Sequence, residues 1–137
     1  MTRATSMLDI LMIHCGPAWA RRASSRDEIS RLVRAAGGCG ADFMLFLTDD
    51  ELWIHDVWRL PRQPGAPQGF PAVQALRLAS AARAAGMVVV QERDDPVPRR
   101  PDLDLTDGIK DLLAESGIEL LDHLLIARGL VSVCRPK

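Results

Sequence analysis

The chain has 137 residues, 47% of them hydrophobic, and a formal net charge of −1 at pH 7. This length and apolar content fit one globular domain with its own hydrophobic core. The near-neutral charge excludes a general attraction to nucleic acid, which would need a local basic patch. The absence of tyrosine argues against an aromatic platform for single strands.

The N-terminal residues partly imitate a secretory signal. Arg3 precedes an apolar run from Leu8 to Ile13, and small residues surround Trp19. Asp9 interrupts the run, which is therefore too short and too polar for a signal sequence. Elsewhere no stretch approaches the roughly 20 apolar residues that span a bilayer. We therefore expect a cytoplasmic protein that does not insert into a membrane.

Three cysteines, Cys15, Cys39 and Cys134, form an odd set without paired spacing. A small secreted scaffold held by disulfides would show an even set of cysteines. We therefore predict free or buried thiols in a reducing compartment.

The first predicted elements are a short apolar segment and a helix. Residues 7–13 suit either a strand or one buried face of a helix. After a break at Gly16-Pro17, Ser24-Ser25 and Asp27-Glu28 are typical of a helix start, with hydroxyls to cap it and acids in its first turn. Apolar residues then recur at helical spacing until Gly37-Gly38, which end the helix.

A β-hairpin is predicted next. Residues 42–48 form a continuous apolar run, as expected for a central strand covered on both faces. Asp49-Asp50 predicts a turn, and residues 52–58 its hairpin partner. The spacing of Trp53 and Trp58 does not suit a single face of that strand, so we expect one of them to be exposed.

The remaining elements alternate between helices and strands, and this alternation predicts an α/β sandwich with a mixed sheet. Proline and glycine mark the loops between them. We expect a Pro/Gly-rich loop over 61–69, a helix over 71–86, a buried strand over 87–90, a charged loop over 91–101, a helix over 102–116, and closing strands over 120–126 and 130–133.

Residues 117–134, Gly-Ile-Glu-Leu-Leu-Asp-His-Leu-Leu-Ile-Ala-Arg-Gly-Leu-Val-Ser-Val-Cys, resemble the end of the RadC-type JAB/MPN (JAMM) domain, where a helix runs into "gi-LLDH-lii-G-g-yvS". Ser25 to Ala35 looks like the family's "SPEDVA-xLLR" helix. Residues 43–52 are similar to its "VLFLD-xxN-xLI" hairpin. Residues 71–90 match the helix and strand that lead into its metal motif.

This resemblance implies a fold and a division of the chain. The fold would be a JAB/MPN-like (cytidine-deaminase-like) α-β-α sandwich with a mixed central sheet, in a single domain over residues 24–134. Residues 1–23 would be an N-terminal extension of unknown role, and residues 135–137 a tail.

The family's metal motif is degenerate in this chain. Intact JAMM domains hold Zn²⁺ with a His-x-His and an Asp, leave one position to water, and use an upstream Glu as general acid/base. The corresponding residues here are Gln91 and Arg93 for the histidines, Asp102 for the aspartate and Arg99 for the motif serine. We name these four the vestigial metal positions. The upstream region near residues 40–42 has no Glu.

These replacements imply that the family's zinc is lost. An amide is a poor zinc ligand, and a guanidinium carries only donors and a permanent charge. We expect no cofactor and no retained catalytic residue. We also predict that Arg93 or Arg99 occupies the former metal space and pairs with Asp102, so that a guanidinium replaces the charge of the ion.

A rebuilt site is the alternative to a lost one. Cys39, Glu92, Asp95 and Asp102 could all approach the vestigial pocket, but they include no histidine, and transition-metal sites usually need better ligands. His123 falls on the family's Asp-His pair, which does not bind metal there. We expect His123 to pack or to orient backbone near the last strand.

These features predict a catalytically inactive RadC-like JAB domain that acts as a protein-binding or structural module, through self-association or through pairing with another protein. Two alternatives stay open. One is a metal-dependent hydrolase or peptidase with rearranged ligands. The other is a DNA-repair-associated accessory protein, whose nucleic-acid contacts would rest on Arg93, Arg99 and Arg100 beside the neutralising Asp94-Asp95.

Overall fold

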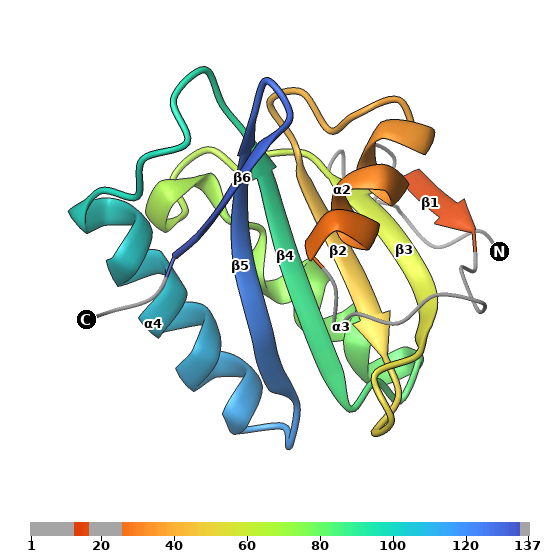
Figure 1. The fold of residues 1–137 in the computed structure, drawn as a ribbon. Helices are drawn as coiled ribbons and strands as arrows, with labels where there is room; N and C mark the ends of the chain where they lie inside the picture. The colour runs from red at the N-terminus through yellow and green to blue at the C-terminus, as the bar shows by residue number, and fades with distance from the viewer. Residues whose placement is uncertain (1–12, 17–25, 135–137) are drawn as a thin grey trace, which may run out of the picture.

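A computed structural model describes residues 13–16 and 26–134, and in these residues six strands form one mixed sheet (Figure 1). The strand order is β1-β3-β2-β4-β5-β6, and only β4 and β5 are parallel neighbours. The elements are β1 (Ile13–Gly16), α2 (Arg26–Ala35), β2 (Phe43–Thr48), β3 (Ile54–Leu60), the 3₁₀ turn η1 (Pro67–Gly69), α3 (Ala72–Ala81), β4 (Gly86–Glu92), α4 (Arg100–Ala114), β5 (Glu119–Ala127) and β6 (Leu130–Val133).

Helices cover both faces of the sheet, with α2 on one face and α3 and α4 on the other (Figure 1). Side chains of β2 and β4 alternate between these faces because successive residues of a strand point in opposite directions. Leu45 and Val89 pack in the cluster with α3 and α4, whereas Met44 and Val90 pack in the cluster with α2. The predicted α/β class, the mixed sheet and the two-sided burial of the central strand are confirmed.

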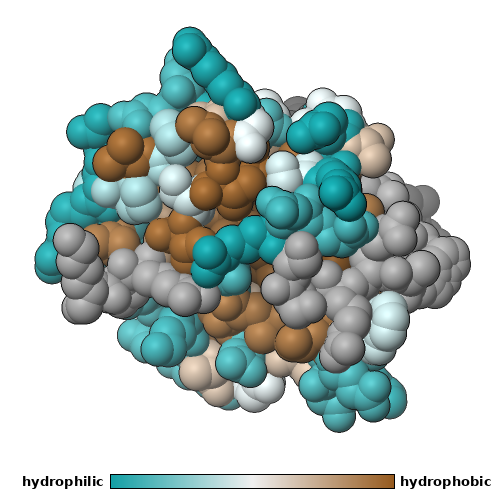
Figure 2. Space-filling view, viewed as in Figure 1, coloured by the Kyte–Doolittle hydropathy of each residue, from teal (hydrophilic) through white to brown (hydrophobic). Residues whose placement is uncertain are grey.

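The space-filling view of the α2 side shows where hydrophilic and hydrophobic residues lie on this surface (Figure 2). Hydrophilic atoms follow the outer side of α2, as expected of an amphipathic helix. Its inner side buries Ile29 and Val33 against the sheet. Hydrophobic atoms are visible on either side of the helix. Partly buried Leu121, Val131 and Val133 pack at the border of the same core.

Several predicted boundaries were wrong. The helix predicted over 71–86 ends at Ala81, because the chain turns at Arg83, where φ is 53°, and enters β4 at Gly86. β4 extends into the predicted charged loop, since Gln91 still pairs with both neighbouring strands. The last helix starts at Arg100, two residues earlier than predicted, and ends at Ala114.

The hairpin is also displaced relative to the prediction. β3 begins at Ile54 because Leu52 has a positive φ of 71° and belongs to the turn. Trp53, which precedes β3, is 38% exposed, whereas Trp58 within β3 packs against the core, so one of the two tryptophans is exposed as predicted.

Residues 1–12 and 17–25, which include most of the predicted N-terminal extension and its apolar segment, lie outside the described residues, as does the predicted tail 135–137. Ile13–Gly16 form an edge strand that pairs antiparallel with β3. Within the described ranges, no helix has the length and the apolarity needed to cross a membrane.

Candidate functional site

The vestigial metal positions lie where the end of β4 meets the start of α4. Gln91 lies in β4, Arg93 is the first residue after β4, and Asp102 lies in the first turn of α4. β5 runs parallel beside β4, and its register places His123 opposite Val89, two residues before Gln91. Gln91 and His123 therefore point to the same face of the sheet, the face that α4 covers.

Arg93 and Asp102 form a partly buried ion pair. Arg93 Nη1 lies 2.7 Å from Asp102 Oδ1, and Arg93 Nη2 donates to the carbonyl of Val97 at 3.0 Å. The second carboxylate oxygen, Asp102 Oδ2, accepts the backbone N–H of Arg99 at 2.8 Å. The predicted pairing of a guanidinium with Asp102 is confirmed, and Arg93 is the residue that provides it.

Arg99 and Arg100 bind other carboxylates. Arg99 Nη2 is 2.7 Å from Asp95 Oδ2, and Arg100 Nε is 3.1 Å from Asp104 Oδ1. The backbone N–H of Val97 and the Arg99 guanidinium lower the pKa of Asp95. Because Arg93, Arg99 and Arg100 each have a carboxylate partner, the loop and the start of α4 do not form an uncompensated basic patch.

A chain of hydrogen bonds begins at Arg62 and runs inward through Gln91. Arg62 Nη2 donates to Gln91 Oε1 at 2.9 Å, and Gln91 Nε2 lies 2.7 Å from His123 Nε2. A guanidinium cannot accept a hydrogen bond, so the amide oxygen must face Arg62 and the amide nitrogen must face the imidazole. The amide nitrogen is then the donor, and His123 Nε2 is the acceptor.

This direction determines the tautomer of His123. With Nε2 accepting, the ring proton of the neutral imidazole is on Nδ1, which lies 2.8 Å from Thr106 Oγ1. Thr106 Oγ1 in turn donates to the backbone carbonyl of Asp102 at 2.9 Å. Each contact in the series Arg62, Gln91, His123, Thr106 therefore joins a donor to an acceptor. We call these four residues and Asp102 the polar network.

Burial keeps His123 neutral. The residue is 1% exposed, and burial lowers the pKa of its imidazole to about 4, while the charge of Asp102 raises it and that of Arg93 lowers it. The imidazole therefore stays uncharged near neutral pH. This matches the hydrogen bonds, because a protonated ring would place a donor opposite the amide nitrogen of Gln91.

The donor set does not fit zinc. The carbonyl oxygen of Gln91 is engaged by Arg62, and His123 Nε2 is engaged by the amide of Gln91. The cation of Arg93 lies directly on Asp102, where it would repel a metal ion. Across residues 13–16 and 26–134, no group of three or more His, Cys, Asp or Glu side chains is arranged to hold a metal.

The residues considered for a rebuilt site lie apart. Glu92 points to the α2 side, where its Oε1 accepts the backbone N–H of Cys39. Asp102 lies on the α4 side with Arg93, and Asp95 lies in the loop with Arg99. The sheet separates Glu92 from Asp102, because Gln91 and Glu92 are successive residues of one strand and point to opposite faces.

Two members of the polar network had no role in the sequence prediction. Thr106 is four residues after Asp102, so helical periodicity places both on one face of α4, and this spacing could have indicated it. Arg62 is 29 residues from Gln91, in the Pro/Gly-rich loop, and no local pattern indicates that contact.

A comparison with models of protein families gives no match for this chain, and no curated protein matches it. Any function must therefore be argued from the side chains of the site.

Proposed function

We propose that this chain is a catalytically inactive RadC-like JAB/MPN domain that serves in the cytoplasm as a protein-binding or structural module. The α/β class with helices on both faces of a mixed sheet is compatible with that family. The observation that carries the proposal is the ion pair between Arg93 and Asp102, two of the vestigial metal positions.

The ion pair supports loss of the metal for an electrostatic reason. A zinc site of this type needs neutral imidazoles and a carboxylate around one open position. Here the Arg93 guanidinium, a permanent cation, pairs with the carboxylate of Asp102. The amide of Gln91 is part of an internal chain of hydrogen bonds. The guanidinium also ties the loop to α4 through Val97, so the charge of the lost ion would be replaced by a structural contact.

Metal content is the first test. We expect the full chain, purified without a chelator or an affinity tag, to contain no stoichiometric metal, and its Tm to be the same with added Zn²⁺ and with EDTA. A ligand that binds only the native state raises the Tm, so an unchanged Tm means that no such site exists. Stoichiometric metal together with a chelator-sensitive Tm would overturn the proposal in favour of a rebuilt metallohydrolase.

Restoring the histidines tests whether these positions descend from a metal site. The variant Gln91→His/Arg93→His would place two imidazoles on one face of the strand beside Asp102, which makes three protein ligands. We expect Zn²⁺ to raise its Tm. A free Zn²⁺ concentration of 100 times Kd would add about 2.7 kcal/mol to the free energy of unfolding. Each single variant is the matched control and should respond far less. No response of the double variant would contradict the assignment of these positions.

The binding role is tested separately, by sedimentation equilibrium of the full chain for self-association and by DNA retention at low salt. Retention of DNA that falls steeply with salt would favour the DNA-associated alternative. The pairing of Arg93, Arg99 and Arg100 with carboxylates gives that alternative no support in this loop.

A further inference from the structure

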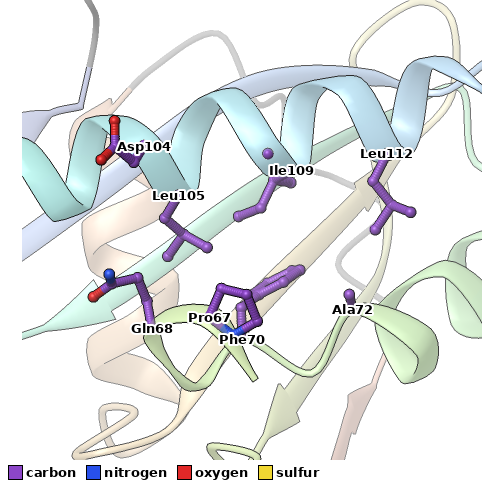
Figure 3. A pocket seen from close by; sticks show the side chains of 9 residues that line it. Pro67, Gln68, Phe70, Ala72, Asp104, Leu105, Ile109 and Leu112 are labelled. Carbon is purple, nitrogen blue, oxygen red and sulfur yellow. The ribbon is translucent and has the colours of Figure 1, made fainter. Parts of the chain in front are cut away.

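A groove of about 310 Å³ lies between η1 and α4, on the same side of the sheet as the polar network (Figure 3). Phe70, Leu105 and Ile109 line its middle, and all three are also members of the hydrophobic core. Phe70 is held edge-on against Phe43, with ring centroids 5.1 Å apart. The apolar floor is therefore preformed by core packing, as in most small-molecule sites.

The two ends of the groove differ in polarity. Figure 3 shows Asp104 of α4 and Gln68 of η1 at one end, and Leu112 and Ala72 at the other. The backbone of Gln68 is fixed there by Arg62, whose Nη1 donates to the carbonyl of Gln68 at 2.7 Å. A ligand would thus meet an apolar surface along most of its length and a polar pair at one end.

Among the described residues that line the groove, Asp104 is the one that carries a charge, and the Arg62 guanidinium lies behind the carbonyl of Gln68 without lining the groove. Asp104 pairs with the exposed Arg100, and the two side chains, Arg100 and Asp104, are 84% and 59% exposed. Such surface pairs contribute little and are easily rearranged, so the carboxylate remains accessible to a ligand. The neighbouring exposed surface of α4 adds Asp107 and Asp111, with Lys110 as the nearby cation.

Gly108 is an independent indication that the groove is kept open. It lies in the interior of α4, where glycine is among the least favourable residues. A Cβ added at this position would meet no atom of the described residues within 4 Å, so packing does not require glycine. Gly108 does line the groove, and a longer side chain there would project into it.

We propose that this groove binds a small amphipathic molecule, with an apolar body over Phe70, Leu105 and Ile109 and a cationic end at Asp104. Its volume is at the lower limit of small-molecule sites and is too small for a helix of a partner protein. The inference goes beyond the proposed function and does not depend on it, because none of the vestigial metal positions lines the groove.

Two probes that share one apolar body test the proposal, 4-phenylbutylamine and 4-phenylbutyrate. We expect the amine to shift the backbone amide resonances of Gln68, Gly108 and Leu112 saturably in the ¹⁵N-labelled full chain, and the carboxylate to bind more weakly. Asp104→Asn, an exposed change that spares the core, should remove the preference for the amine. Equal affinity for both probes in the unchanged protein would overturn the assignment of a cationic ligand.

Blocking the groove is the second test. Gly108→Leu should abolish the saturable shifts, whereas Ala114→Leu, the same side chain on an exposed and uncharged position of the same helix outside the groove, should leave the affinity for the amine unchanged. Thermal melts verify that both variants fold. The proposal is wrong if neither probe shifts these resonances in the unchanged protein, or if a folded Gly108→Leu binds the amine as tightly as the unchanged protein.

Discussion

Arg93 donates to the carboxylate of Asp102 from one nitrogen and to the carbonyl of Val97 from the other. The same carboxylate accepts the backbone N–H of Arg99. Removing either charged partner would leave the other partly buried and unpaired, a costly change compared with losing an exposed pair. The type of side chain at position 93 therefore affects both the chemistry of the site and the attachment of the loop to α4.

His123 makes stability depend on pH in a specific window. Its folded pKa of about 4 lies below its ordinary value of 6.5, so the unfolded chain binds more protons between these values. The contribution of His123 is complete above about pH 6.5 and is lost as the pH falls towards 4. This difference in pKa corresponds to about 3 kcal/mol.

The check is urea denaturation of the unchanged protein and of His123→Gln at several pH values. We expect the free energy of unfolding to fall less steeply in the variant between pH 6.5 and pH 4, since the acidic residues contribute equally to both proteins. Parallel curves would mean that the imidazole is not held neutral. The ¹⁵N shifts of the ring should independently report a proton on Nδ1 at neutral pH.

At the scale of elements, α4 carries both the site and the groove. Its first turn contains Pro101, which is favourable at a helix start, and Asp102, which caps the backbone N–H of Arg99. Thr106 lies one turn further along α4 and contacts His123 of β5, while Leu105 and Ile109 face the core and the groove. One helix thus positions two separate surfaces, because its periodicity places residues 102 and 106 on one side and residues 104 and 108 on another.

Gly108→Ala should stabilise the chain. Alanine is preferred over glycine in a helix interior by about 1 kcal/mol, and a Cβ at this position meets no described atom within 4 Å. We expect the free energy of unfolding from urea denaturation to rise by up to that amount. Gly86→Ala is the contrasting control and should destabilise, because its Cβ would lie 2.7 Å from Thr48 Oγ1 and 2.9 Å from Leu121 Cδ1. A destabilising Gly108→Ala would show that α4 needs glycine for its own packing.

At the scale of the whole molecule, the sheet divides the side chains between two layers. Cys39 and Glu92 belong to the α2 side, whereas Asp102, Thr106 and His123 belong to the α4 side. A single metal site built from both sets would need side chains to pass through a close-packed sheet. The rebuilt site considered from the sequence is therefore not assembled in this structure.

The reactivity of the two buried thiols, Cys39 and Cys134, can show whether each layer opens. Burial and the charge of Glu92 raise the pKa of Cys39 to about 12, and burial and the charge of Asp102 raise that of Cys134 to about 11. Because the thiolate is the reactive form, both should resist 5,5′-dithiobis(2-nitrobenzoate) in the native protein. In a Cys15→Ser background, we expect urea to accelerate both reactions in parallel with unfolding. A Cys39 that reacts well before Cys134 would show that the α2 layer opens independently.

The sequence alone determined the order of the elements and the burial of β2 on both faces. These features follow from local periodicity and from the kind of side chain at each position, which neighbouring residues suffice to reveal. The guanidinium next to Asp102 was expected only because the chain resembles the JAMM motif, and that resemblance did not decide between Arg93 and Arg99. The early end of α3 was missed because the left-handed backbone at Arg83 has no signal in an alanine-rich run.

Only the tertiary structure decided which side chains meet across the sheet. The contact of Arg62 with Gln91 and that of Gln91 with His123 join residues 29 and 32 positions apart. Both depend on strand register and on the path of the loop, and a register shift of one residue would move Gln91 to the α2 side. The tautomer of His123, the separation of Glu92 from Asp102 and the groove beside Gly108 all follow from that packing, because long-range contacts are set by the assembled sheet rather than by neighbouring residues.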